Sequence, residues 1–71
     1  MEKFISLLCE ILELRADALS PETELHKIKT WDSVAMVHFL AMADMEYHRN
    51  IIIEDLVAAD TIKDLFTLTG S

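Results

Sequence analysis

The fold is decided by residues 30–47, TWDSVAMVHFLAMADMEY, where a long irregular stretch meets an almost continuously apolar segment. Asp32 and Ser33 are residue types that begin helices, because a short side-chain oxygen can accept hydrogen bonds from the free N–H groups of the first turn. We therefore predict a helix over about residues 33–47. The Ser33 hydroxyl would then lie on the surface beside the partly positive helix N-terminus, a place that favours an attached anion such as a phosphodiester.

Apolar residues cover more than one side of this predicted helix. Val34, Val37, Ala41 and Met45 form one line along it. The others are Met36, Phe39, Leu40, Ala43 and Tyr47. A helix that is apolar nearly all round is either buried on most sides or presents apolar surface to a partner. The pattern alone leaves both alternatives open.

The residues before this helix predict an amphipathic helix followed by a loop. Apolar residues at three- and four-residue spacing, with charged residues between them, favour a helix over about residues 2–14. From residue 15 to residue 32 the pattern lapses, and Ser20-Pro21 marks a turn. Three apolar residues are expected to pin this long loop to the helices: Leu19, Leu25 and Ile28. Trp31 is interpreted as a partial plug of the core, with a ligand platform as the alternative.

The residues after the central helix predict a connector and two shorter helices. Ile51 and Ile53 of the connector are expected to point inward, and a short helix is expected over about residues 54–58. A last helix over about residues 61–69 would be capped by Asp60 or Thr61, and Thr61 and Asp64 have the spacing of a capping box. Gly70 would end it. The expected fold class is all-α, a small four-helix bundle with a long loop between its first two helices.

Length and charge limit the classes of function. The 71 residues suit one domain, residues 1–71, too small to enclose a large catalytic cavity as well as a core. Thirteen acidic and six basic side chains give a net charge of −7, which repels nucleic acid and anionic membranes and favours partners with basic surfaces. No N-terminal targeting pattern and no membrane-length apolar stretch is found, so a soluble cytoplasmic protein is expected.

Chemical motifs are sparse. The single cysteine, Cys9, has no disulfide partner in the chain and is expected to pack as a small apolar residue in a protein of a reducing compartment. The three histidines lack the spacing of zinc ligands, and the chain has one glycine and no glycine-rich phosphate loop. No catalytic residue and no metal ligand is therefore predicted, and the isolated chain is not expected to be an enzyme.

The arrangement of motifs resembles the acyl carrier protein and peptidyl carrier protein family. In that family an Asp-Ser-Leu triplet, often preceded by Gly-Trp, opens the second helix. Here the triplet is Asp32-Ser33-Val34 with Trp31 in front. Acidic residues and an aromatic one follow in the family near the end of that helix, and residues 44–47 supply them here. The likeness continues through an acidic short helix and a last amphipathic helix.

The resemblance implies a non-enzymatic carrier with a four-helix fold. Its cofactor would be 4′-phosphopantetheine, joined to Ser33, with Asp32 helping to position the transferase. Acyl or aminoacyl intermediates would be held on that arm as thioesters. The implied partners are a phosphopantetheinyl transferase, an acyl- or aminoacyl-loading ligase and downstream synthases, and the protein would be a monomer.

The resemblance also divides the central helix into two sides. The core side would hold Phe39, Leu40, Ala43 and Tyr47. The partner-docking side, together with Trp31 before the helix, would hold Val34, Val37, His38, Ala41 and Asp44.

Three residues depart from the family pattern: Thr30 replaces a frequent Gly, Val34 replaces Leu, and His38 stands where an acidic residue is common. The central helix is also poor in acidic residues compared with fatty-acid carriers. This favours a dedicated biosynthetic pathway, for fatty acids, polyketides or nonribosomal peptides, with its own loading ligase.

Two alternatives compete with the carrier hypothesis. One is a helical adaptor that binds another protein through the central helix and uses Asp32 and Ser33 only as a helix cap. The other is regulatory phosphorylation of Ser33, which would also place an anion at the helix start.

Overall fold

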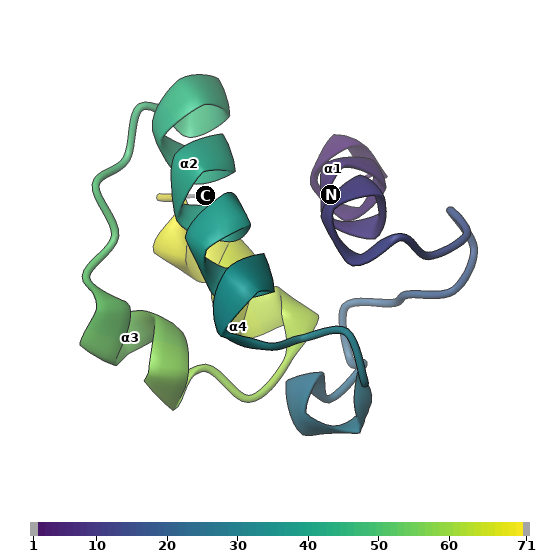
Figure 1. The fold of residues 1–71 in the computed structure, drawn as a ribbon. Helices are drawn as coiled ribbons and strands as arrows, with labels where there is room; N and C mark the ends of the chain where they lie inside the picture. The colour runs from purple at the N-terminus through teal and green to yellow at the C-terminus, as the bar shows by residue number, and fades with distance from the viewer. Residues whose placement is uncertain (1, 71) are drawn as a thin grey trace.

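A computed structural model of the chain describes residues 2–70. Its elements are α1 (Glu2–Leu12), the short 3-10 helix η1 (Leu25–Lys27), α2 (Ser33–Tyr47), α3 (Ile53–Ala58) and α4 (Ile62–Leu68). The predicted all-α class is confirmed. In Figure 1, α1 lies on one side of α2 and α3 on the other, while α4 passes behind α2.

Helix α1 is amphipathic as predicted, with four buried residues at helical spacing: Phe4, Leu8, Cys9 and Leu12. It ends two residues before the predicted boundary. Glu13 adopts a left-handed backbone conformation with φ of 58°, and the Leu14 N–H donates to the Cys9 carbonyl at 2.9 Å. This geometry closes a helix, but glycine is its usual residue, so no stop signal is recognisable at Glu13.

The long loop is tied to the core and to α4. Leu19 and Leu25 are buried and Ile28 packs against the core, as predicted for the pinning residues. The Leu25 N–H donates to the Asp60 carbonyl at 2.8 Å, and Glu24 forms an isolated antiparallel bridge with Thr61. These bonds hold the loop in place where it leads into α2.

The connector and α3 differ from the prediction at one residue. Ile51 is half-buried, but the prediction that Ile53 points inward was wrong, because Ile53 is the first residue of α3 and 46% exposed. Helix α3 therefore starts one residue earlier than predicted, and its buried residue is Leu56.

Helix α4 begins at the predicted capping box. The Asp64 N–H donates to Thr61 Oγ1 at 3.3 Å, and the Thr61 N–H donates to Asp64 Oδ2 at 3.2 Å. Thr61 is the N-cap, so the helix proper spans Ile62–Leu68 within the predicted range 61–69. Gly70 follows with φ of 90°, a left-handed conformation that suits a helix end at glycine.

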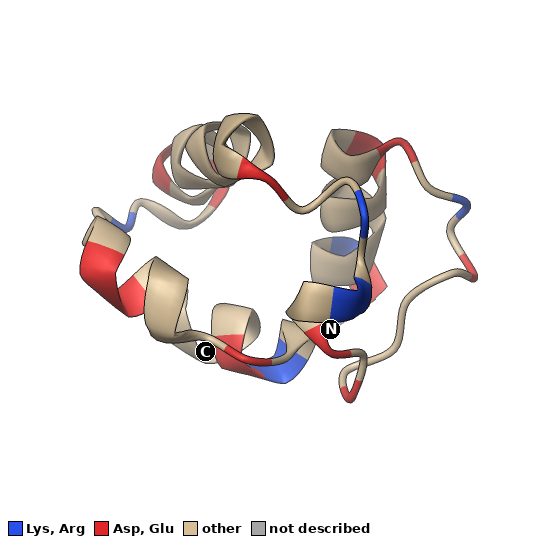
Figure 2. Ribbon diagram, turned by 60° about the horizontal axis from the view of Figure 1, so that its bottom comes forward, with Lys and Arg blue, Asp and Glu red and all other residues tan. Residues whose placement is uncertain are grey.

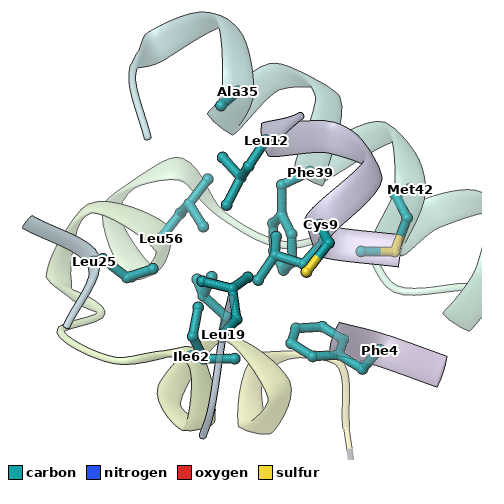
Figure 3. Packing of buried hydrophobic residues seen from close by; sticks show 12 residues of the cluster. Phe4, Cys9, Leu12, Leu19, Leu25, Ala35, Phe39, Met42, Leu56 and Ile62 are labelled. Atoms are coloured by element: carbon teal, nitrogen blue, oxygen red, sulfur yellow. The ribbon is translucent and has the colours of Figure 1, made fainter. Parts of the chain in front are cut away.

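The core gathers side chains from every helix and from the loop (Figure 3). Phe4 of α1 is fully buried and contacts three other rings edge-on: their centroids lie 6.0 Å (Phe39), 6.2 Å (Tyr47) and 5.1 Å (Phe66) away. Leu56 and Ile62, each fully buried, bring α3 and α4 into the same cluster. The core thus fixes α2 against the other helices through Phe39.

Candidate functional site

The start of α2 assigns different roles to two adjacent polar residues. Asp32 has an extended backbone and is the N-cap, because its Oδ1 accepts a hydrogen bond from the Ala35 N–H at 2.9 Å. Ser33 is the first helical residue and is exposed. Within residues 2–70 its hydroxyl takes part in no hydrogen bond. The helix is therefore capped by Asp32, and the Ser33 hydroxyl is left facing solvent.

Trp31 anchors the loop residues that lead into α2. Its indole is half-buried and meets the ring of Phe39 edge-on, with centroids 6.1 Å apart and planes at 76°. Its backbone N–H donates to the Ile28 carbonyl at 3.1 Å. Trp31 is thus a partial plug of the core, in agreement with the favoured prediction, and it anchors the chain just before Asp32 and Ser33 at the start of α2.

Helix α2 divides cleanly into a core side and an open side. Ala35, Phe39, Met42 and Ala43 are buried. Leu40 and Tyr47, predicted on the core side, are half-buried and pack against the core. All five docking residues predicted on the helix are exposed: Val34, Val37, His38, Ala41 and Asp44. The alternative that places every apolar residue of this helix in the core is therefore excluded.

The open side of α2 is apolar and continuous with Ser33. Val34 is 62% exposed, Val37 61% and Met45 73%. Successive residues of an α-helix turn by about 100°, so these three side chains and Ser33 share one side of the helix. We call this the α2 face, made of Ser33, Val34, Val37, His38, Ala41, Asp44 and Met45.

One edge of the α2 face adjoins α1. Val34 and His38 line a shallow depression of about 250 Å³ together with Ile11 and Leu12 of α1 and with Asp32. Further along, Lys3 Nζ of α1 lies 3.4 Å from Glu46 Oε1 of α2. His38 therefore lies at the α1 edge of the face, and the opposite edge is turned toward α3, which lies on the other side of α2 (Figure 1).

Exposed apolar residues on α3 were missed by the sequence prediction. Ile53 and Val57 are 46% and 65% exposed, and Ile52 before the helix is 60% exposed. The sequence predicts an extended connector at this isoleucine run, with Ile51 and Ile53 turned inward. A six-residue helix that buries Leu56 instead turns its other apolar residues outward.

The described part of the chain was also searched for a metal site, a reactive cysteine and a membrane-spanning helix. In the part of the chain that the structure describes, no three His, Cys, Asp or Glu side chains come together in a way that would hold a metal ion. Cys9 is 3% exposed, and burial, with the negative charge of Asp17 as a smaller cause, raises the pKa of its thiol. None of the described helices is long and apolar enough to cross a membrane.

Comparisons with known proteins add no relative: no family model, curated protein or solved structure matches the chain.

Proposed function

We propose that this chain is an acyl carrier protein, which holds acyl or aminoacyl intermediates as thioesters on a 4′-phosphopantetheine arm attached to Ser33. The observation that carries this proposal is the division of roles at the start of α2. Asp32 supplies the cap through its bond to the Ala35 N–H, and the Ser33 hydroxyl is exposed and free of that task. A serine that served only the helix would be expected to accept a bond from the first turn.

The position suits a phosphodiester. Ser33 is the first residue of a fifteen-residue helix, where the free N–H groups and the helix dipole favour negative charge. Asp32 uses Oδ1 for the cap, which leaves Oδ2 for the transferase or for a metal ion that the transferase brings. The Ser33 hydroxyl would lose its proton and form the new O–P bond as the pyrophosphate bond of coenzyme A breaks and adenosine 3′,5′-bisphosphate leaves. Ser33 is thus the residue acted upon rather than a catalyst.

The thioester chemistry belongs to the arm and to the partner enzymes. Tethering holds the intermediate at high effective concentration near successive active sites. The α2 face beside Ser33 is where a transferase, a loading ligase and downstream synthases would dock. Its apolar character supports a dedicated biosynthetic pathway with its own ligase. We propose that the carrier acts there as a cytoplasmic monomer.

Intact mass spectrometry tests the proposal. Purified protein is incubated with coenzyme A and a broad-specificity phosphopantetheinyl transferase, beside a control carrier. The wild type should gain the mass of one phosphopantetheine, and Ser33→Ala should gain none. Ser6→Ala is the matched control, because Ser6 is also an exposed helical serine, and it should load like the wild type.

Failure of the wild type to load while the control carrier loads would contradict the proposal. The exposed α2 face would then favour the adaptor, a helical protein that binds a partner and carries nothing. In that case Ser33→Ala would leave partner binding unchanged.

A further inference from the structure

A depression of about 400 Å³ lies where the end of α1 meets the long loop. Its apolar walls come from both segments and consist of Leu14, Ala18, Leu19 and Ile28. Leu19 is buried, while Leu14 and Ile28 are half-buried and pack against the core. The volume lies in the lower part of the range of small-molecule sites, about 300–1,000 Å³. The depression therefore offers a small ligand apolar surface that is still partly open to water.

The charge of this depression is opposite to that of the chain. Its remaining lining residues are polar or basic: Thr23, Lys27, Lys29 and Thr30. Among the described residues that line it, none is Asp or Glu, although the chain has a net charge of −7. Four other depressions, of about 250–370 Å³, each contain at least one Asp or Glu. In Figure 2 the chain that leads from η1 into α2 carries blue, whereas the start of α3 is red.

The two lysines differ in what they already contact. Lys27 Nζ lies 2.9 Å from Glu24 Oε2, so its charge is paired within the loop. Lys29 is exposed and forms no ion pair with any residue in the range 2–70. The exposed Thr30 beside it can donate a hydrogen bond from its hydroxyl. The rim of the depression therefore has one unpaired ammonium group for an anion.

The loop holds the depression in shape without a ligand. Thr23 Oγ1 accepts a hydrogen bond from the Ser20 N–H at 2.9 Å. The Ile28 N–H donates to the Leu25 carbonyl at 3.0 Å, and Leu25 is itself buried in the core. A site that is formed in advance loses less conformational entropy when a ligand binds.

We propose that this depression binds a small dissolved carboxylic acid, whose apolar body covers the apolar walls and whose carboxylate meets the Lys29 ammonium. A carboxylate suits a single unpaired cation. A phosphate, with about two negative charges, would be only half neutralised there. The inference is independent of the proposed carrier function, because the ligand is not tethered and needs neither Ser33 nor an arm.

NMR titration of isotope-labelled protein with 4-phenylbutyrate at neutral pH tests the inference. Amide signals of the lining residues between 14 and 30 should shift, and the titration gives a Kd. Lys29→Gln should weaken binding about three- to fivefold, as for the stronger ion pairs at exposed sites. Ala18→Phe should weaken it about tenfold or more, because the added ring at this exposed position would fill the depression. Lys63→Gln is the matched control, because Lys63 is an exposed lysine of α4 outside the depression, and should bind like the wild type.

The neutral analogue 4-phenylbutyramide tests the role of the charge. It should bind the wild type about three- to fivefold more weakly than the acid, and Lys29→Gln should leave its affinity unchanged. Equal affinities of the acid and the amide for the wild type would overturn the inference, because the site would then recognise only apolar surface. Absence of shifts at the depression up to about 10 mM acid would overturn it as well. Circular dichroism checks that each variant folds.

Ser33→Ala separates this inference from the proposed function. The variant should bind 4-phenylbutyrate like the wild type, whether or not the wild type can be loaded by a transferase. Loss of binding in Ser33→Ala would place the ligand at the start of α2 and would overturn the inference, while leaving the loading experiment unaffected.

Discussion

The Asp32 carboxylate accepts a hydrogen bond from the Ala35 N–H at 2.9 Å and thereby closes the first turn of α2. Asp32→Ala removes this cap, so we expect the free energy of unfolding to fall by about 1 kcal/mol. Urea denaturation followed by circular dichroism measures it.

Ser33→Ala is the matched control for the cap. Ser33 is exposed and makes no capping bond, so this change should alter stability by less than about 0.5 kcal/mol. Equal losses for the two substitutions would show that the serine shares the cap, and the argument for a free hydroxyl would fail.

Phe4 is the residue on which the core depends most. Its ring is fully buried and meets Phe39, Tyr47 and Phe66 edge-on. Phe4→Leu keeps an apolar side chain but loses the ring contacts, and should cost about 1–2 kcal/mol. Phe4→Ala should cost about 3–5 kcal/mol, which approaches the whole stability expected of so small a domain. If Phe4→Leu and wild type denature at the same urea concentration, the three ring contacts contribute nothing measurable.

Asp64 makes the stability of the α4 start depend on pH. Its Oδ2 accepts two hydrogen bonds, from the Asp60 N–H at 2.9 Å and from the Thr61 N–H at 3.2 Å. These bonds, that of Asp60 first, lower the pKa of the Asp64 carboxyl below its ordinary value of 3.8. The Asp64 carboxyl therefore binds a proton less tightly in the folded protein than in the unfolded chain. The resulting stabilisation is complete above pH 3.8 and is lost as the pH falls through the lowered pKa.

The difference between wild type and Asp64→Asn isolates this effect from the other carboxyl groups. Thermal melts from pH 6 down to pH 2 should show the wild type losing its advantage over the variant below about pH 4. A constant difference across that range would mean that the Asp64 charge does not contribute.

The bounds of α2 could be predicted from the sequence because local signals agree there. A capping aspartate precedes the apolar run, and polar residues 48–50 follow it. Both α1 and α2 end at a left-handed residue other than glycine, Glu13 with φ of 58° and His48 with φ of 55°, so neither end carries the usual glycine signal. The end of α1 was missed because the apolar Leu14 continues the helical pattern past Glu13.

The candidate site was predictable in its residues but not in its surroundings. Asp32 and Ser33 were recognisable as the start of a helix, but only the structure shows that Asp32 alone makes the capping bond. The outward direction of Val57 depends on Leu56 reaching the core formed with α1 and α2, which is a long-range contact. A six-residue segment does not contain that information, so the exposed apolar residues of α3 were missed.

Cys9 offers a way to count attached arms. It is 3% exposed within the core, and burial raises the pKa of its thiol, so little reactive thiolate is present at neutral pH. We expect the native protein without an arm to react with a thiol reagent at least about ten times more slowly than the urea-unfolded protein. After loading by the transferase, the native wild type should gain one fast-reacting thiol, that of the arm, and Ser33→Ala should gain none. A fast thiol in the unloaded native protein would show that Cys9 is accessible and would contradict the packing of α1.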